Sequence, residues 1–191
     1  PRGLALRAEA YAASRRAADA YALLGALRQQ HALPEDVLVQ RERDWAAQAL
    51  AEAGDGNALA ERWESLPKAL RAEPRVVAAY ADRAAALRWE DAATSSIEHA
   101  LDARWDEGLA ARYGQLPVER IEHREATARR WLQQHPGSPA LLLALARLAL
   151  RRGDWPEAEA LLQRALDQGA GPDAWETLGD GLAAAGDGPR G

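Results

Sequence analysis

The feature of this sequence that most constrains its fold begins at Pro139, where two apolar stripes at helical spacing flank a short turn. The stripes consist of Leu142, Leu145, Ala146 and Ala149, followed by Ala158, Leu162 and Ala165. Gly153 and Asp154 stand between the stripes, and both residue types favour turns. Because small residues let antiparallel helices approach closely while large residues fill the remaining space, the pattern predicts a helical hairpin.

Weaker versions of this hairpin recur along the chain. One begins at Pro172, where Trp175 opens a W-x-x-L-G sequence whose leucine is Leu178, and the sequence ends before its second helix. Another begins at Pro74, and an irregular unit separates it from the hairpin at Pro139. Runs of helical spacing between breaks at Gly and Pro predict one long helix or a helical pair over residues 4–30. They predict further helices over residues 34–53, 57–71, 105–113 and 119–134.

The composition agrees with helices throughout the chain. Ala and Leu dominate, Val and Ile are rare and Phe is absent. Strands favour β-branched and aromatic residues, and no segment of four or more residues alternates as a half-buried strand would. The sequence therefore predicts an all-α fold in a single domain over residues 1–191. Within it, residues 1–56 are expected to be divergent repeats and residues 57–191 clearer ones, the last of them truncated.

The order of large and small residues from Pro139 resembles the 34-residue tetratricopeptide repeat (TPR). This resemblance implies an α-α superhelix of about five helix pairs, in which the first helices of the pairs line a surface that binds partners. Counting from Pro139, and adding a neighbour from the preceding unit, we expect this partner-binding groove to include Arg112, Leu143, Arg147, Leu150 and Arg151. Arginine pairs well with carboxylates, so the groove is predicted to engage an acidic partner or the propionates of a tetrapyrrole.

A longer resemblance, over about residues 57–170 and more loosely over the first 56, is to the C-terminal region of the HemY family. It is carried by Trp63-Glu64-Ser65-Leu66-Pro67, Tyr80-Ala81, Trp105-Asp106, Tyr113-Gly114, Trp131-Leu132 and His135-Pro136. HemY proteins are bacterial inner-membrane TPR proteins associated with haem and porphyrin biosynthesis. The resemblance implies a scaffold for tetrapyrrole-pathway enzymes, held at that membrane by an N-terminal anchor that we expect to lie outside this sequence.

Several function classes are disfavoured by what the sequence lacks. The net charge is -5 and there is no basic stripe, which argues against a nucleic-acid partner. The absence of cysteine excludes disulfides, thiolate metal sites and thiol nucleophiles. Neither a Walker-type phosphate loop nor a G-x-S-x-G elbow is present. We therefore expect a protein that is not an enzyme, with no cofactor and no metal site, and a fragment that is itself soluble.

The histidines and tryptophans are interpreted as structural. No histidine has a second one three or four residues away, and Glu119 with His123 forms at most half of a metal site. His135 stands at a predicted helix end, where a cationic side chain interacts favourably with the helix dipole. Most of the seven tryptophans fall near predicted helix ends, as packing between repeats requires, and Trp89 and Trp155 occupy the same turn position in their units.

Two other functions remain open at this point. One is a direct haem or porphyrin carrier, which needs an apolar pocket of tetrapyrrole size. The other is a generic TPR adaptor in envelope assembly or secretion. A third use of TPR domains, clamping the acidic C-terminus of chaperones, depends on Lys and Asn at fixed groove positions. It is disfavoured because Lys68 and Asn57 are the only residues of these types.

Overall fold

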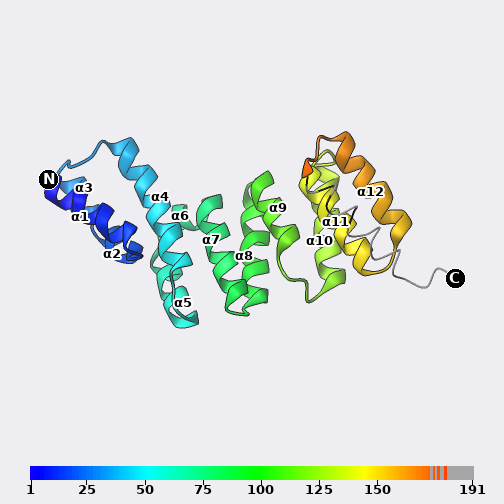
Figure 1. Cartoon of the computed structure of the whole chain (residues 1–191), viewed down its shortest axis with the longest axis horizontal. Coiled ribbons are helices and arrows are strands. Elements are labelled where there is room, and N and C mark those ends of the chain that lie inside the picture. The colour runs from blue at the N-terminus through cyan, green and yellow to red at the C-terminus, as the bar shows by residue number, and fades with distance from the viewer. Residues whose placement is uncertain (173, 175, 177–178, 180–191) are drawn as a thin grey trace. The chain divides into compact units, whose positions relative to one another are not determined.

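The computed structural model describes residues 1–172, 174, 176 and 179, and within these residues it contains helices and no strands. This confirms the predicted all-α, TPR-like fold (Figure 1). The described helices are α1 (Arg2–Ala13), α2 (Ala17–Ala22), α3 (Leu24–Gln29), α4 (Glu35–Ala51), α5 (Gly56–Ser65), α6 (Lys68–Arg71), α7 (Pro74–Ala86), α8 (Glu90–Ala103), α9 (Glu107–Gln115), α10 (Ile121–Gln134), α11 (Pro139–Arg151) and α12 (Trp155–Asp167).

The chain divides into two compact units, unit 1 over Pro1–Trp105 and unit 2 over Asp106–Gly191. A single domain over residues 1–191 stays a prediction. The truncated repeat expected after Pro172 cannot be compared, because Trp175 and Leu178 lie outside the described residues. None of the described helices is long and apolar enough to cross a membrane.

Two predicted helical segments are divided into more helices than the spacing of their apolar residues indicates. Residues 4–30 form three helices, because Arg15 adopts a left-handed φ of 58° that ends α1 and the chain turns again at Leu23. Residues 57–71 form α5 and α6 because Leu66 is extended, as a residue before proline prefers, and Pro67 then begins the short α6.

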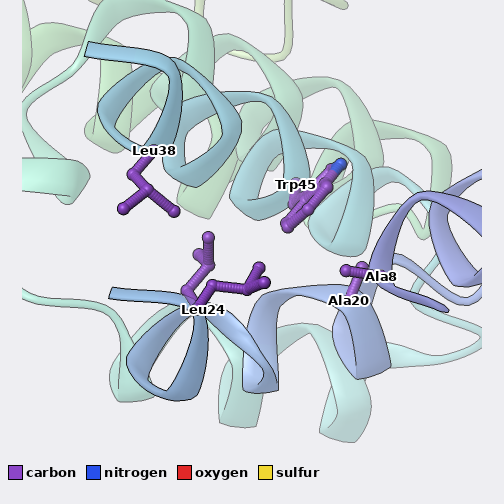
Figure 2. Close-up of a cluster of buried hydrophobic side chains, with 6 residues drawn as sticks. Ala8, Ala20, Leu24, Leu38 and Trp45 are labelled. Carbon is purple, nitrogen blue, oxygen red and sulfur yellow. The ribbon is translucent and has the colours of Figure 1, made fainter. Parts of the chain in front are cut away.

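Unit 1 is built around α4 and α7. Helix α4 packs against α2, α3, α5 and α7, and α7 also packs against α5, α6 and α8. The core between α1–α3 and α4 is shown in Figure 2, where Leu24 lies opposite Leu38 and Ala8 and Ala20 face Trp45. These side chains are almost completely buried. The otherwise polar helix α4 is therefore held in place by its apolar face.

The tryptophans form several kinds of packing contact. Trp131 is buried and its ring meets Tyr113 edge to face at a centroid distance of 4.9 Å, and Trp63 stacks on Tyr80 at 4.2 Å. Trp89 is 40% exposed, yet its ring lies against Gly56, where an added Cβ would come within 2.3 Å of it. Packing is thus the role of these three tryptophans, even where part of the ring meets water.

Unit 2 is built around α11, which packs against α9, α10 and α12. The hairpin predicted from Pro139 is present: α11 and α12 are joined at Gly153, whose φ of 76° favours glycine. All seven residues of the predicted apolar stripes are buried. At the other end of α11, Glu107 of α9 accepts hydrogen bonds from the Ser138 hydroxyl (2.8 Å) and the Ala140 amide (2.9 Å).

The contact between α9 and α11 depends on the absence of a side chain at Gly114. A Cβ added to Gly114 would lie 2.9 Å from Ala144 Cβ and 3.5 Å from Ala144 Cα. Ala144 is buried and its Cβ is fixed to a helix backbone, so it cannot move aside as a flexible side chain could.

Substituting Gly114→Ala is expected to lower the free energy of unfolding by about 1–3 kcal/mol, because α9 and α11 must separate to admit the methyl group. Urea unfolding followed by circular dichroism measures the change. Gly3→Ala, in the first turn of α1, is the matched control: its Cβ meets nothing within 4 Å, so the substitution should not lower the free energy of unfolding. Equal effects of the two substitutions would contradict this account of the contact.

A network of four charged side chains joins α10, the turn at residues 152–154 and α12. Arg129 pairs with Glu125 at 3.1 Å and with Glu157, and Arg152 pairs with Glu125 at 3.1 Å and with Glu157 at 3.0 Å. The hydrogen bond from Arg129, followed by that from Arg152, lowers the pKa of Glu157 below its ordinary value of 4.5. The charged form of Glu157 therefore stabilises the folded state.

Glu157→Gln is expected to destabilise the protein by less than about 1 kcal/mol, because the network is partly exposed. Since folding lowers the pKa of Glu157, the loss should be fully present above pH 4.5 and disappear as pH falls through the lowered folded value. Thermal unfolding across pH measures this difference. Glu159→Gln, an exposed change on the same helix outside this network, is the matched control.

Candidate functional site

A hollow of about 400 Å³ lies in unit 2 between the end of α9 and the C-terminal half of α11; we call it the unit 2 hollow. Its α11 wall consists of residues spaced three and four apart, which places them on one helix face. The lining residues are Gly114, Gln115, Leu116, Pro117, Val118, Arg124, Ala144, Arg147, Leu148 and Arg151. It is therefore formed largely by the two helices that meet at Gly114 and Ala144.

The inner wall of the unit 2 hollow is held by Arg124 of α10, which is 4% exposed. Its guanidinium donates hydrogen bonds to the carbonyls of Tyr113 (2.9 Å), Leu116 (3.3 Å) and Pro117 (3.0 Å). It also lies 4.6 Å from the centre of the Tyr113 ring. Because three donors of one planar group are used on backbone oxygens, Arg124 fixes the path of the chain after α9.

Arg147 and Arg151 are the groups of the unit 2 hollow that remain available for a ligand. Arg147 is half-buried and Arg151 is exposed. Across the part of the chain that the structure describes, neither side chain has a hydrogen bond or an ion pair, and no acidic residue lines the hollow. Two guanidinium groups in a partly enclosed space, with no internal anion, are suited to bind a carboxylate.

The structure brings together two of the five residues predicted for the partner-binding groove, namely Arg147 and Arg151. The lining residues of α11 share one sector of about 100° around the helix, and Leu143 and Leu150 lie outside this sector. Leu143 is buried and Leu150 half-buried. Arg112 of α9 does not line the hollow; it is half-buried and has contacts of its own within the chain.

A second and larger hollow, of about 970 Å³, lies in unit 1; we call it the unit 1 groove. Sequence analysis did not predict it. It is lined by residues of α5 to α8 and of the segments that join or follow them, namely Trp63, Lys68, Ala69, Arg71, Ala72, Glu73, Tyr80, Ala92, Ser95, Ser96, His99, Ala100, Ala103 and Arg104.

A repeated sequence is the signal that could have pointed to the unit 1 groove. Residues 59–67 (LAERWESLP) and 109–117 (LAARYGQLP) share Leu, Ala, Arg, an aromatic residue and Leu-Pro at the same spacing. Both segments end a helix that begins at a side-chain cap, Asp55 or Asp106, and both end at a buried leucine with extended backbone. Each hollow lies beside one copy.

The histidines show no arrangement for metal binding. Among the described residues, no three His, Asp or Glu side chains gather where they could hold a metal ion. His135 is the residue at which α10 ends, the position predicted for it.

Arg124→Met is expected to lower the free energy of unfolding by about 2–4 kcal/mol, because it leaves the carbonyls of Leu116 and Pro117 without their donor and that of Tyr113 with only the Leu116 amide, at 3.4 Å. Arg124→Lys should recover little, since an ammonium group cannot reproduce the planar fork. Arg151→Met, an exposed change at the same hollow, should lie within about 0.5 kcal/mol of the wild type. Urea unfolding measures all three, and a fully stable Arg124→Lys protein would refute this role for Arg124.

Comparison with known proteins identifies a family match within unit 2. No curated protein and no solved structure matches the chain. The matched segment contains most of α10 and all of α11 and α12. These are the helix predicted over residues 119–134 and the two helices of the hairpin predicted from Pro139. Residues 126–180 match the tetratricopeptide repeat family.

Proposed function

We propose that this protein is a protein-binding scaffold, and that the unit 2 hollow receives a carboxylate of its partner. The observation that carries the proposal is the pair Arg147 and Arg151, which line a hollow beside a repeat of the TPR family and have no acidic partner among the described residues. Because such a site is preformed, the protein loses little conformational entropy when the partner binds. The charge of the site then selects the partner.

The pathway in which the scaffold acts is proposed from the resemblance of residues 57–170 to the HemY family. On that basis, the partners are enzymes of haem or porphyrin biosynthesis, and the full-length protein acts at the bacterial inner membrane. TPR repeats also serve many other pathways, so the identity of the partner decides this part of the proposal independently of the binding site.

The binding site is tested by capturing partners from a lysate of the source bacterium on immobilised protein and quantifying them by mass spectrometry. Arg147→Glu together with Arg151→Glu should lower retention of the specific partner about tenfold or more, because reversed charges repel its carboxylates. The matched controls are single changes: Arg151→Glu should weaken retention and Arg164→Glu should not, since Arg164 is equally exposed but lies on α12 outside the hollow.

The same capture separates the possible pathways. Recovery of tetrapyrrole-synthesis enzymes that depends on Arg147 and Arg151 supports both parts of the proposal. Recovery of unrelated envelope or secretion proteins would keep the scaffold and replace the pathway. Retention that is unchanged by the double charge reversal would remove the unit 2 hollow as the binding site.

A further inference from the structure

The unit 1 groove contains four basic side chains without partners. They are Lys68 and Arg71 from α6, His99 from α8 and Arg104 just after it. Among the described residues, none of these side chains has a hydrogen bond or an ion pair, and the Nε of Arg71 is buried without an acceptor. Lys68 and Arg104 are exposed, so a ligand in the groove can reach their charged groups.

One acidic residue lines the unit 1 groove, and it is engaged in an ion pair; the exposed Glu64 lies near Tyr80 outside the lining. Glu73 is the one acidic residue that lines the groove, and it pairs with Arg43 at 3.3 Å. The groove therefore presents an excess of positive charge in a protein whose net charge is -5. Local positive charge of this kind is complementary to an acidic ligand and not to a basic one.

The rest of the lining is apolar and leaves room. Trp63 and Tyr80, stacked on each other, contribute the aromatic surface, and the five alanines of the lining fill little of the space. Burial raises the pKa of the Tyr80 phenol, and nearby Glu64 raises it further, so the hydroxyl stays protonated and can donate a hydrogen bond. Such a surface accepts an aromatic or long apolar side chain beside acidic groups.

The length of the unit 1 groove indicates the kind of ligand that fits it. Its α8 wall extends from Ala92 to Ala103, a distance of about 16 Å at 1.5 Å per residue. An extended peptide covers this distance with about five residues at 3.3 Å each. The volume of about 970 Å³ is at the upper end of the range for small-molecule sites, as expected for a peptide groove.

We propose that the unit 1 groove binds an internal acidic peptide segment of a partner protein, with an aromatic side chain of that segment packed near Trp63 and Tyr80 and its carboxylates beside Lys68, Arg71 and Arg104. This inference rests on the proposed function only in its general form, protein binding. It concerns different residues in a different unit, so the two can fail separately.

The probe is a fluorescein-labelled peptide blocked at both ends, with the sequence Glu-Asp-Glu-Phe-Glu-Asp-Glu, and binding is measured by fluorescence anisotropy on the intact chain. Blocking the C-terminus ensures that an internal segment is tested. Two comparison peptides replace the acidic residues with lysine or the phenylalanine with alanine. We expect the lysine peptide not to bind and the alanine peptide to bind at least about fivefold more weakly.

Two charge-reversed proteins locate the site. Lys68→Glu with Arg104→Glu changes two exposed groove residues and should weaken binding of the acidic peptide at least about tenfold. Arg2→Glu with Arg88→Glu changes the net charge equally at exposed positions of unit 1 outside the groove, and should leave the affinity unchanged. Ser95→Trp, at another exposed lining position, should block the groove sterically without altering charge. Circular dichroism confirms that each variant is folded.

The outcomes separate the unit 1 groove from the unit 2 hollow. Loss of binding in the Lys68/Arg104 pair and in Ser95→Trp, with the Arg2/Arg88 pair unaffected, supports the proposal. Absence of binding to the wild-type chain, or equal loss in both charge-reversed pairs, would overturn it. The protein with Arg147→Glu and Arg151→Glu is measured with the same peptide. If it alone loses peptide binding, the proposal for the unit 1 groove is overturned and the function proposed for the unit 2 hollow is supported.

Discussion

Close approach of helices through small residues is the constraint on which unit 2 depends. Gly114 and Ala144 bring α9 against α11, and the alanines of the Pro139 hairpin bring α11 against α12. A helix as apolar as α11 cannot remain exposed, so it must be covered on most sides. The same contact creates the unit 2 hollow: α9 ends just beyond Gly114, and α11 continues past it, carrying Arg147 and Arg151 into the open space.

The three arginines that line the unit 2 hollow differ in their contacts. Arg124 is buried and uses its donors on the backbone at the end of α9, whereas Arg147 and Arg151 have no hydrogen bond or ion pair within the described chain. The difference follows from position, since α10 directs Arg124 at the carbonyls of Tyr113, Leu116 and Pro117, where α9 ends. Arg124 therefore fixes the wall of the hollow that lies across from α11, and a wall held in this way keeps the hollow preformed.

The sequence predicted the helices and the Pro139 hairpin because apolar periodicity and turn residues are local signals. It left open whether residues 4–30 form one helix or a pair, because a left-handed residue such as Arg15 leaves no mark on periodicity. Of the five predicted groove residues, Arg147 and Arg151 line the unit 2 hollow, whereas Leu143 and Leu150 do not. Helical spacing shows which residues share a face, but which flank a neighbour covers depends on tertiary packing. The unit 1 groove was missed because its residues come from separate helices.

The repeated segment at residues 59–67 and 109–117 explains why both units contain a cationic hollow. In each copy, Leu-Pro ends a helix early, because the residue before proline is extended, and the buried leucine anchors that end. Space is left beside the helix end, and the residues that follow determine its chemistry. After Pro67 the chain forms α6 with Lys68 and Arg71, which makes a long groove, whereas after Pro117 it is held by Arg124, which makes a small hollow. The same helix end at Leu-Pro thus lies beside two positively charged hollows of different volume. Two such sites would let a scaffold bind two acidic segments independently.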